Sequence, residues 1–329
     1  MSNSSINNPA YYINGILSSD ISILSRAITL VESTKEEHQV LASQIIDGII
    51  EKTGDSFRLG ITGVPGVGKS TFIESFGVEL ANSGKKVAIL AIDPSSQKSK
   101  GSILGDKTRM EKLAVHPSVY IRPSPSSGTL GGVAQKTFES ILLCEAAGYD
   151  FIIVETVGVG QSEITISGMT DFFLLLMLAG AGDELQGIKR GIMEMADAVL
   201  ITKADGNNIQ KAKNARNEYA HALHLFPPTE SSWVPKVETC SSLNNEGIQN
   251  FMKIIEEYKN LVINNGYFEK KRRDQLKDWL HQSITEKLKT EFYNSPKIKQ
   301  ELEKIENSFS KTNLNPYKLA AELISKWKS

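Results

Sequence analysis

Residues 63–70 read Gly-Val-Pro-Gly-Val-Gly-Lys-Ser, which matches the pattern Gly-x-x-x-x-Gly-Lys-Ser/Thr. The preceding Phe57–Thr62 predicts a strand, and the residues after Lys69 predict a helix. Glycines let the backbone curl so that its N–H groups point at phosphate oxygens, and the helix N-terminus attracts an anion. A plain glycine turn is disfavoured, because a chance match is rare at average composition. The unit predicts an α/β fold of the P-loop NTPase class.

The central part of the chain alternates short apolar runs with longer amphipathic stretches. Helical patterns such as Val133–Ala147 and Ile209–Leu225 fill most gaps between the runs. This alternation predicts a mostly parallel sheet covered by helices on both faces. Besides Phe57–Thr62, the expected strands are Lys86–Ile92, Val119–Arg122, Phe151–Val154, Phe172–Leu178, Ala198–Thr202 and Lys236–Cys240.

The pattern divides the chain into three parts. Residues 1–55 form an N-terminal helical extension, in which Ser33-Thr34-Lys35-Glu36 resembles a helix start. Residues 56–266 form the P-loop domain, and residues 267–329 form a C-terminal helical extension. Trp279, Tyr317 and Trp327 in the last part are costly to leave in water, so we expect it to pack against a partner or a second copy.

Composition excludes several classes of protein. A net charge of −1 lacks the excess of positive charge that is typical of proteins that bind nucleic acid or an acidic membrane. The apolar run Asp171–Ala181 is shorter than the ~20 residues that cross a bilayer and predicts a buried strand. Cys144 and Cys240 are far apart, which is typical of reduced thiols, and the polar start lacks the order of a signal peptide. We therefore expect a cytoplasmic protein.

The loop implies a magnesium-bound nucleotide. Lys69 would bridge the terminal phosphates and the Ser70 hydroxyl would bind Mg²⁺. The ion needs further oxygen ligands, and Asp93 and Glu155 end two predicted strands, where open α/β sheets bind ligands. Asp106 follows in a loop. The predicted metal set is Ser70, Asp93, Asp106 and Glu155, although each carboxylate could instead be a helix cap or a solvated turn residue.

Residues 155–158, Glu-Thr-Val-Gly, have the features of a nucleotide-sensing switch. An acidic residue near the metal is followed by Gly158, whose N–H can reach a γ-phosphate, and loss of this contact on hydrolysis would release the segment. Gln161 either positions a water molecule or simply starts a helix.

Residues 202–205, Thr-Lys-Ala-Asp, follow a predicted strand and are similar to the guanine-reading motif Asn-Lys-x-Asp. The Asp205 carboxylate can accept two hydrogen bonds from guanine that adenine cannot supply, and the Lys203 stem would lie along the base. Thr202 replaces an amide that usually ties this segment to the phosphate loop, so we expect a weaker tie and lower affinity. Ser242 and Leu243 follow the next strand, where such proteins place a base-contacting loop. The predicted nucleotide-binding residues are Gly63, Val64, Pro65, Gly66, Val67, Gly68, Lys69, Ser70, Thr71, Gly158, Lys203, Asp205, Ser242 and Leu243.

Taken with these motifs, the chain resembles the MeaB/ArgK family of GTPases, relatives of the methylmalonic aciduria type A protein. The stretches that carry the resemblance are Ser25–Ser33, Gly63–Thr71, Ala91–Ser96, Val154–Ser162 and Gly180–Gly191. The resemblance implies a homodimer formed through C-terminal arms, and a chaperone that gates cofactor loading of adenosylcobalamin-dependent methylmalonyl-CoA mutase and protects it. It also implies the same magnesium shell and GTP/GDP as the nucleotide.

The segment Gly180–Gly191 contains four glycines and several charged residues. The resemblance implies a switch loop that senses the partner, in which Lys189 or Arg190 supplies transition-state charge. The alternative is a surface loop that leads into a helix over Ile188–Ala196. With this loop included, the predicted catalytic residues are Lys69, Glu155 and Lys189.

Two other functions fit the same fold. A nickel-delivering metallochaperone would need a His-rich tract or paired cysteines, whereas the chain has five scattered histidines and two cysteines. A kinase linked to amino-acid transport would need a base that positions the acceptor, and the sequence has no sign of one. A magnesium-dependent GTPase that acts as a mutase chaperone is the expected function.

Overall fold

The computed structural model describes residues 7–93, 110–125, 130–156, 162–180, 190–307 and 315–328. The chain divides into two compact units, Met1–Gln275 and Leu276–Ser329, and helix α13 (Tyr267–Asn294) runs through the boundary. The three-part division expected from the sequence stays a prediction.

The first unit contains a seven-stranded sheet, as far as the described residues show, in the order β3-β2-β4-β1-β5-β6-β7. Every pair of neighbouring strands is parallel, so the predicted α/β fold is confirmed and the sheet is parallel throughout. The strands are β1 (Phe57–Gly63), β2 (Val87–Asp93), β3 (Val119–Pro125), β4 (Phe151–Thr156), β5 (Phe172–Leu178), β6 (Ala198–Thr202) and β7 (Lys236–Thr239). Each predicted strand is present, with ends that differ by at most a few residues.

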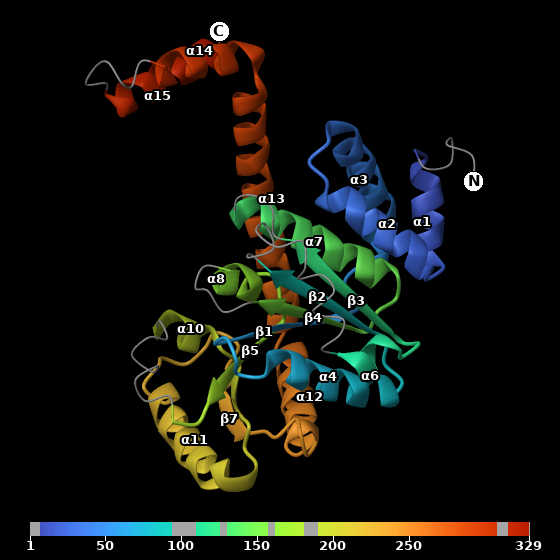
Figure 1. Ribbon diagram of the computed structural model, residues 1–329, viewed down its shortest axis with the longest axis vertical. Coiled ribbons are helices and arrows are strands. Elements are labelled where there is room, and N and C mark those ends of the chain that lie inside the picture. Colours follow the sequence, from blue (N-terminus) through green and yellow to red (C-terminus); the bar gives the residue numbers. More distant parts are fainter. Residues whose placement is uncertain are drawn as a thin grey trace. The chain divides into compact units, whose positions relative to one another are not determined.

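Helices cover both faces of this sheet, which explains why its strands are almost continuously apolar. Along β5, Leu174 and Leu176 pack on one face, while the alternating Leu175 and Met177 pack on the other. The first face is covered by α4 (Lys69–Asn82), α6 (Glu111–Ala114) and α12 (Ile248–Asn264), and the second by α7 (Leu130–Ala146), α8 (Ser162–Ser167), α10 (Arg190–Met195) and α11 (Ile209–Leu223) (Figure 1).

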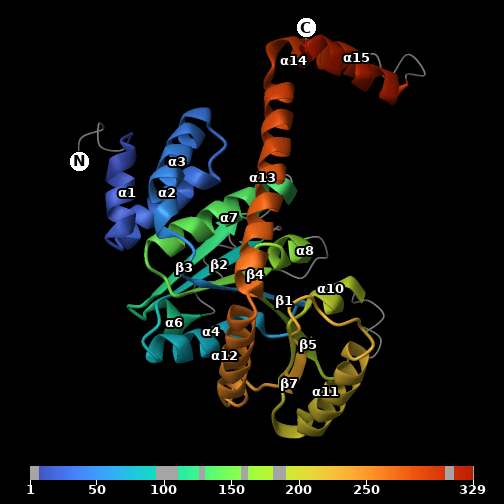
Figure 2. The ribbon, with the colours of Figure 1, turned by 180° about the vertical axis from the view of Figure 1, so that it is seen from behind.

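Three N-terminal helices pack outside α7, as both views show (Figures 1 and 2). They are α1 (Pro9–Leu17), α2 (Ile21–Glu32) and α3 (Glu36–Ile49). A helix does begin within the predicted residues 33–36, but Ser33 is not its N-cap. Ser33 ends α2, and its hydroxyl accepts the backbone N–H of Lys35 at 3.2 Å, whereas the N-cap of α3 is Lys35.

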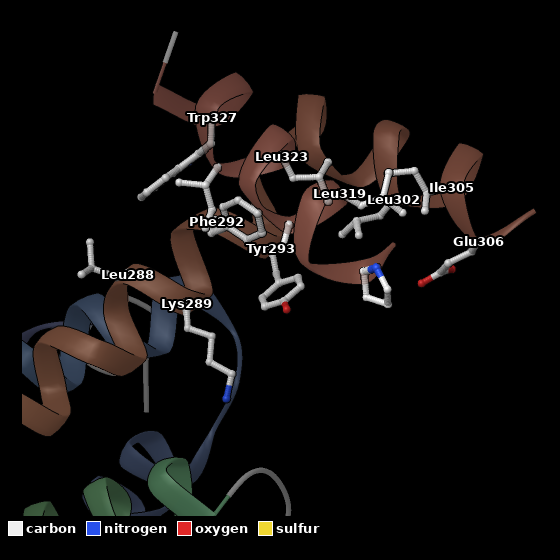
Figure 3. Close-up of a pocket in the computed structure, with 13 residues that line it drawn as sticks. Leu288, Lys289, Phe292, Tyr293, Leu302, Ile305, Glu306, Leu319, Leu323 and Trp327 are labelled. Atoms are coloured by element: carbon white, nitrogen blue, oxygen red, sulfur yellow. The ribbon is translucent and has the colours of Figure 1, made fainter. Parts of the chain in front are cut away.

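The second unit contains the rest of α13 together with α14 (Pro296–Glu306) and α15 (Pro316–Lys328). Lys326 of α15 pairs with Glu301 of α14, and Leu323 is buried between the helices. An apolar pocket of about 520 Å³ lies within this unit, and Figure 3 shows the Phe292 and Trp327 rings side by side in its wall, with centroids 5.6 Å apart. Trp327 is thus shielded in part, whereas Tyr317 remains 89% exposed.

No helix within the described ranges is long and apolar enough to span a membrane.

Candidate nucleotide-binding site

The predicted phosphate loop connects β1 to α4, and three of its residues have backbone angles that favour glycine. The φ angle is 155° at Gly63, 79° at Gly66 and 98° at Gly68. A Cβ at Gly63 would lie 2.6 Å from the Leu176 carbonyl oxygen, so no larger residue fits. Among the described residues, no side chain caps the N-terminus of α4. Its first N–H groups are therefore available to an anion, which the helix dipole also favours.

Three side chains hold the carbonyl groups of this loop. Lys69 Nζ donates to the carbonyl oxygens of Gly63 at 2.7 Å and Val64 at 3.3 Å. Two further donors come from the end of β6. Lys203 Nζ donates to Gly66 O at 2.8 Å, and Thr202 Oγ1 donates to Val67 O at 2.6 Å. Because the C=O and N–H of a trans peptide point in opposite directions, a carbonyl held outward turns the following N–H toward the other side of the loop.

Lys69 is a buried ammonium group that donates hydrogen bonds to backbone carbonyl oxygens. Only 9% of the residue is exposed. Burial lowers the pKa of Lys69, and the negative charges of Glu155 and Glu163 oppose that shift. A phosphate oxygen bound beside Nζ would favour the charged form further. The residue is thus suited to bind an anionic ligand at the mouth of the loop.

Two neighbouring strands end in or near an acidic residue at the carboxyl edge of the sheet next to this loop. Asp93 ends β2, and Glu155 precedes the last residue of the neighbouring strand β4. Thr156 Oγ1 donates to Thr62 Oγ1 at 2.9 Å, which ties the end of β4 to the residue before the loop. Glu155 and Ser70, in the first turn of α4, are both half-buried. This edge therefore carries the oxygen donors that a magnesium ion prefers.

The predicted base-reading segment is fixed by contacts with the loop after β7. Asp205 Oδ2 accepts the Ser241 hydroxyl at 2.7 Å, and the Ala204 N–H donates to Cys240 O at 3.1 Å. The carbonyl of Ser242 accepts Ser75 Oγ of α4 at 3.1 Å. Leu243 is 82% exposed. The two loops and α4 thus form one connected wall beside the phosphate loop.

Thr202 behaves differently from the sequence expectation. Its side chain is 3% exposed, and its hydroxyl donates to the carbonyl of Val67 in the phosphate loop. A hydroxyl therefore makes the tie between the two segments that an amide usually makes, and the lower nucleotide affinity expected from this replacement stays a prediction.

Two site residues were not singled out from the sequence. Ser241 is 1% exposed and orients Asp205, but serine next to Ser242 gives no signal as to which hydroxyl points inward. Glu163, in the first turn of α8, is 1% exposed, and its charge acts on Lys69. A single acidic residue at a helix start usually predicts a solvated position, so only the packing reveals its burial.

Several predicted residues lie outside the described part of the chain. These are Asp106, Gly158, Lys189 and Gln161, and for Asp93 the backbone alone is described. The structure brings together the phosphate loop, Ser70, Glu155, Lys203, Asp205 and Ser242 around the carboxyl edge of the sheet. Their roles in binding and catalysis stay predictions.

A parallel sheet whose central strand runs into a glycine-rich loop and a helix, with a Lys-x-Asp segment after β6, defines the class of P-loop nucleotide-binding proteins. The family described as Methylmalonyl Co-A mutase-associated GTPase MeaB matches residues 24–297. The chain belongs to this family and is a GTPase that binds guanine nucleotides.

Individual relatives agree with this membership. GTPase ArgK of Escherichia coli K12 is 49% identical over 265 residues, which cover 80% of each chain. The mitochondrial methylmalonic aciduria type A homolog of Mus musculus is 42% identical over 325 residues, covering 96% of this chain and 78% of the relative. A solved structure described as LAO/AO transport system kinase has a TM-score of 0.76 and 35% identity, covering 100% of this chain and 99% of that one.

Proposed function

We propose that this GTPase is a magnesium-dependent chaperone of an adenosylcobalamin-dependent acyl-CoA mutase, with methylmalonyl-CoA mutase as the client, and that it gates cofactor loading and protects the mutase. The observation that carries the proposal is the phosphate loop with Lys69 and the adjoining segment with Asp205, in a chain whose family description associates it with that mutase. A GTPase of this kind uses its nucleotide state to control its hold on a partner.

Nucleotide binding would use the wall and the loop described above. The phosphates would lie against residues 63–71, with Lys69 Nζ leaving its carbonyl partners for the terminal phosphates. The guanine would lie between the Lys203 stem and the Ser242–Leu243 turn, with Asp205 accepting its two donors. Catalysis in such a site consists mainly of positioning and charge stabilisation.

Magnesium fits the donors at the carboxyl edge. Ser70, Asp93, Asp106 and Glu155 are all oxygen donors, and Ser70 and Glu155 lie at the sheet edge that holds the phosphate loop. The ion, when bound, would neutralise charge on the phosphates. Gly158 would sense the γ-phosphate, and Lys189 would add positive charge in the transition state.

A second copy of the chain is the partner that we propose for the C-terminal helices. Leu276, Leu280, Ile284 and Leu288 recur every four residues along α13, so they share one helix face. Each is between 47% and 57% exposed, which is unusual for a row of large apolar side chains. Burial of this row in a homodimer would remove it from water.

The test is GTP hydrolysis by the purified protein with and without the adenosylcobalamin-dependent acyl-CoA mutases of its organism, with ATP as the nucleotide control. We expect a rate that rises several-fold with one mutase, and no such rise when Lys69→Ala replaces the wild type. A GTPase rate indifferent to every mutase would contradict the chaperone role while leaving the GTPase activity in place. Phosphate transfer from GTP to another protein would instead favour a kinase.

A further inference from the structure

The turn after β7 closes on itself next to helix α4. Residues 241–246, which we call the base turn, begin and end with a pair of backbone hydrogen bonds between Ser241 and Glu246, at 2.9 and 3.0 Å. The base turn contains Ser242 and Leu243, the two residues expected to contact the base. Because its backbone is closed in this way, the place of the whole turn depends on its contacts with the rest of the protein.

Glu79 of α4 anchors the base turn with both of its carboxylate oxygens. Oε1 accepts the side-chain amide of Asn245 at 3.0 Å, and Oε2 accepts that of Gln249, in the first turn of α12, at 2.7 Å. Helices α4 and α12 lie side by side in both views (Figures 1 and 2). Hydrogen bonds to an ionised acceptor are stronger than those between neutral groups. One carboxylate thus fastens both the base turn and the helix that follows it to α4.

The contacts of Glu79 are part of a longer series that ends at the residue expected to read guanine. Nearer the phosphate loop on α4, Ser75 Oγ donates to the carbonyl oxygen of Ser242 at 3.1 Å. On the other side of the base turn, the Ser241 hydroxyl donates to Asp205 Oδ2 at 2.7 Å. Asn245 has a φ of 57°, in the left-handed region that asparagine adopts more readily than most residues. The base turn is thus held by α4 and itself holds Asp205.

We propose that Glu79 is a positioning residue that keeps the base turn closed on α4 and thereby slows release of the guanine nucleotide. With both amides bound, Ser242 and Leu243 stay against the base, and the nucleotide leaves when the turn opens. Without the carboxylate the turn opens more often, whereas the phosphate loop at the start of α4 keeps its own contacts. The proposal rests on the proposed place of guanine beside this turn.

The variants remove the anchor from either side. Glu79→Ala removes both acceptors, and Glu79→Gln keeps the length and one oxygen, which can accept one of the two amides. Gln249→Ala removes one donor, and alanine suits this exposed helical position. The matched control is Glu74→Ala. Glu74 also lies on α4, but its carboxylate accepts the backbone N–H of Lys112 at 2.9 Å and does not contact the base turn.

The measurement is the rate of GDP release from the full chain, with no mutase present. GDP that carries a fluorescent group on its ribose is bound first, and an excess of unlabelled GDP then displaces it. Calorimetry measures the affinity for pyrophosphate, which occupies the phosphate loop but does not reach the base turn. Thermal unfolding is recorded for every variant.

We expect Glu79→Ala to release GDP roughly fivefold faster than the wild type, the effect of about one net hydrogen bond. Glu79→Gln and Gln249→Ala should each have a smaller effect. Glu74→Ala should match the wild-type rate, and the pyrophosphate affinity should be the same in all variants. Adding Gln249→Ala to Glu79→Ala should not speed release further, because both changes remove the same contact.

Three results would overturn the proposal and leave the base-reading role of Asp205 in place. These are an unchanged rate of GDP release in Glu79→Ala, a loss of pyrophosphate affinity that matches the gain in rate, and full additivity of Glu79→Ala and Gln249→Ala. If Glu79→Ala folds poorly, Gln249→Ala tests the same contact with α4 intact, and wild-type release in that variant counts against the anchor. A wild type that releases ADP as slowly as GDP would remove the foundation, since the base would then not be read at all.

Discussion

Lys69 shows how one buried charge can be prepared for a ligand. Its Nζ lies within hydrogen-bonding distance of two backbone carbonyls, and burial lowers its pKa while Glu155 and Glu163 counteract the shift. Carbonyl dipoles stabilise an ammonium less well than a full negative charge does. Binding of a triphosphate would therefore replace a weak set of partners by a strong one, and this difference favours the bound state.

Lys69→Ala should reduce GTP turnover about 10²- to 10³-fold, the usual loss when one positioned electrostatic contact is removed. Phosphate release would measure the rate, and circular dichroism would check that the fold is kept. Lys213→Ala, at an exposed position on α11, is the control and should keep the wild-type rate. Full activity in Lys69→Ala would refute the assignment of the phosphate loop.

At the scale of elements, a buried ionic network joins α13 and α7 to the amino ends of two strands within the first unit. Arg58 of β1 forms two hydrogen bonds with Glu145 of α7, at 2.8 and 2.9 Å. Arg272 of α13 forms two with Asp171, at 2.6 and 2.7 Å, and a further one with Glu145 at 3.3 Å. Burial alone would raise the pKa of Glu145, but Arg58 and Arg272 hold it below its usual value. Two cations and two anions thus balance in the interior.

Removing one member leaves an unpaired buried charge, which is far more costly than losing the whole network. Arg272→Ala should lower the free energy of unfolding by about 3–5 kcal/mol, as measured by urea denaturation. The neighbouring Arg273 is exposed, so Arg273→Ala should unfold at nearly the wild-type urea concentration. Equal midpoints for the two variants would mean that the network does not stabilise the fold.

Helix α7 contains a second carboxyl group, Glu139, whose pKa is shifted upward, whereas that of Glu145 is shifted downward. Burial raises the pKa of Glu139 to about 7, although the hydrogen bond from Gln135 and the charge of Lys136 act against the shift. A carboxyl group whose pKa is higher in the folded state binds more protons there than in the unfolded chain. Its contribution to stability is therefore complete below about pH 4.5 and is lost as the pH rises to about 7.

Glu139→Gln should remove this penalty while keeping an oxygen that can accept the Gln135 amide. We compare the free energy of unfolding of the variant with that of the wild type. We expect this difference to shift in favour of the variant by up to about 3 kcal/mol between pH 5 and pH 8. Urea denaturation at the two pH values would measure this difference. If the free energies of unfolding of wild type and variant differed by the same amount at pH 5 and at pH 8, a raised pKa of Glu139 would be contradicted.

At the scale of the whole molecule, the exposed apolar row on α13 leads to a prediction about assembly. Leu280→Arg places a charge at a position that is 57% exposed in one chain, so the single chain should fold normally. In a homodimer the same charge would be buried, and dimerisation should weaken by at least tenfold. Light scattering after gel filtration would measure the mass. Asp278→Arg, also exposed but on another face of the helix, should leave the mass unchanged, and identical masses for wild type and Leu280→Arg would reject this interface.

Most of the fold could be predicted from local patterns. The apolar run over residues 172–178 and the glycine-rich loop before Lys69 specify a buried strand and a strand–loop–helix unit wherever they occur. The positions of Ser70, Asp93 and Glu155 at one sheet edge also follow, because parallel strands end on the same side. These features depend on residues that are close in sequence or on the direction of the strands.

The sequence by itself therefore determined the class of fold, the phosphate loop and the segment that is expected to read the base. Only the tertiary structure decided which distant side chains complete the site. Thr202 reaches Val67 across 135 residues, and Arg272 reaches Asp171 across 101. No local pattern encodes such pairs, because a hydrogen bond between buried groups depends on positions to within a few tenths of an ångström. Those positions are set by the packing of the whole sheet and its helices.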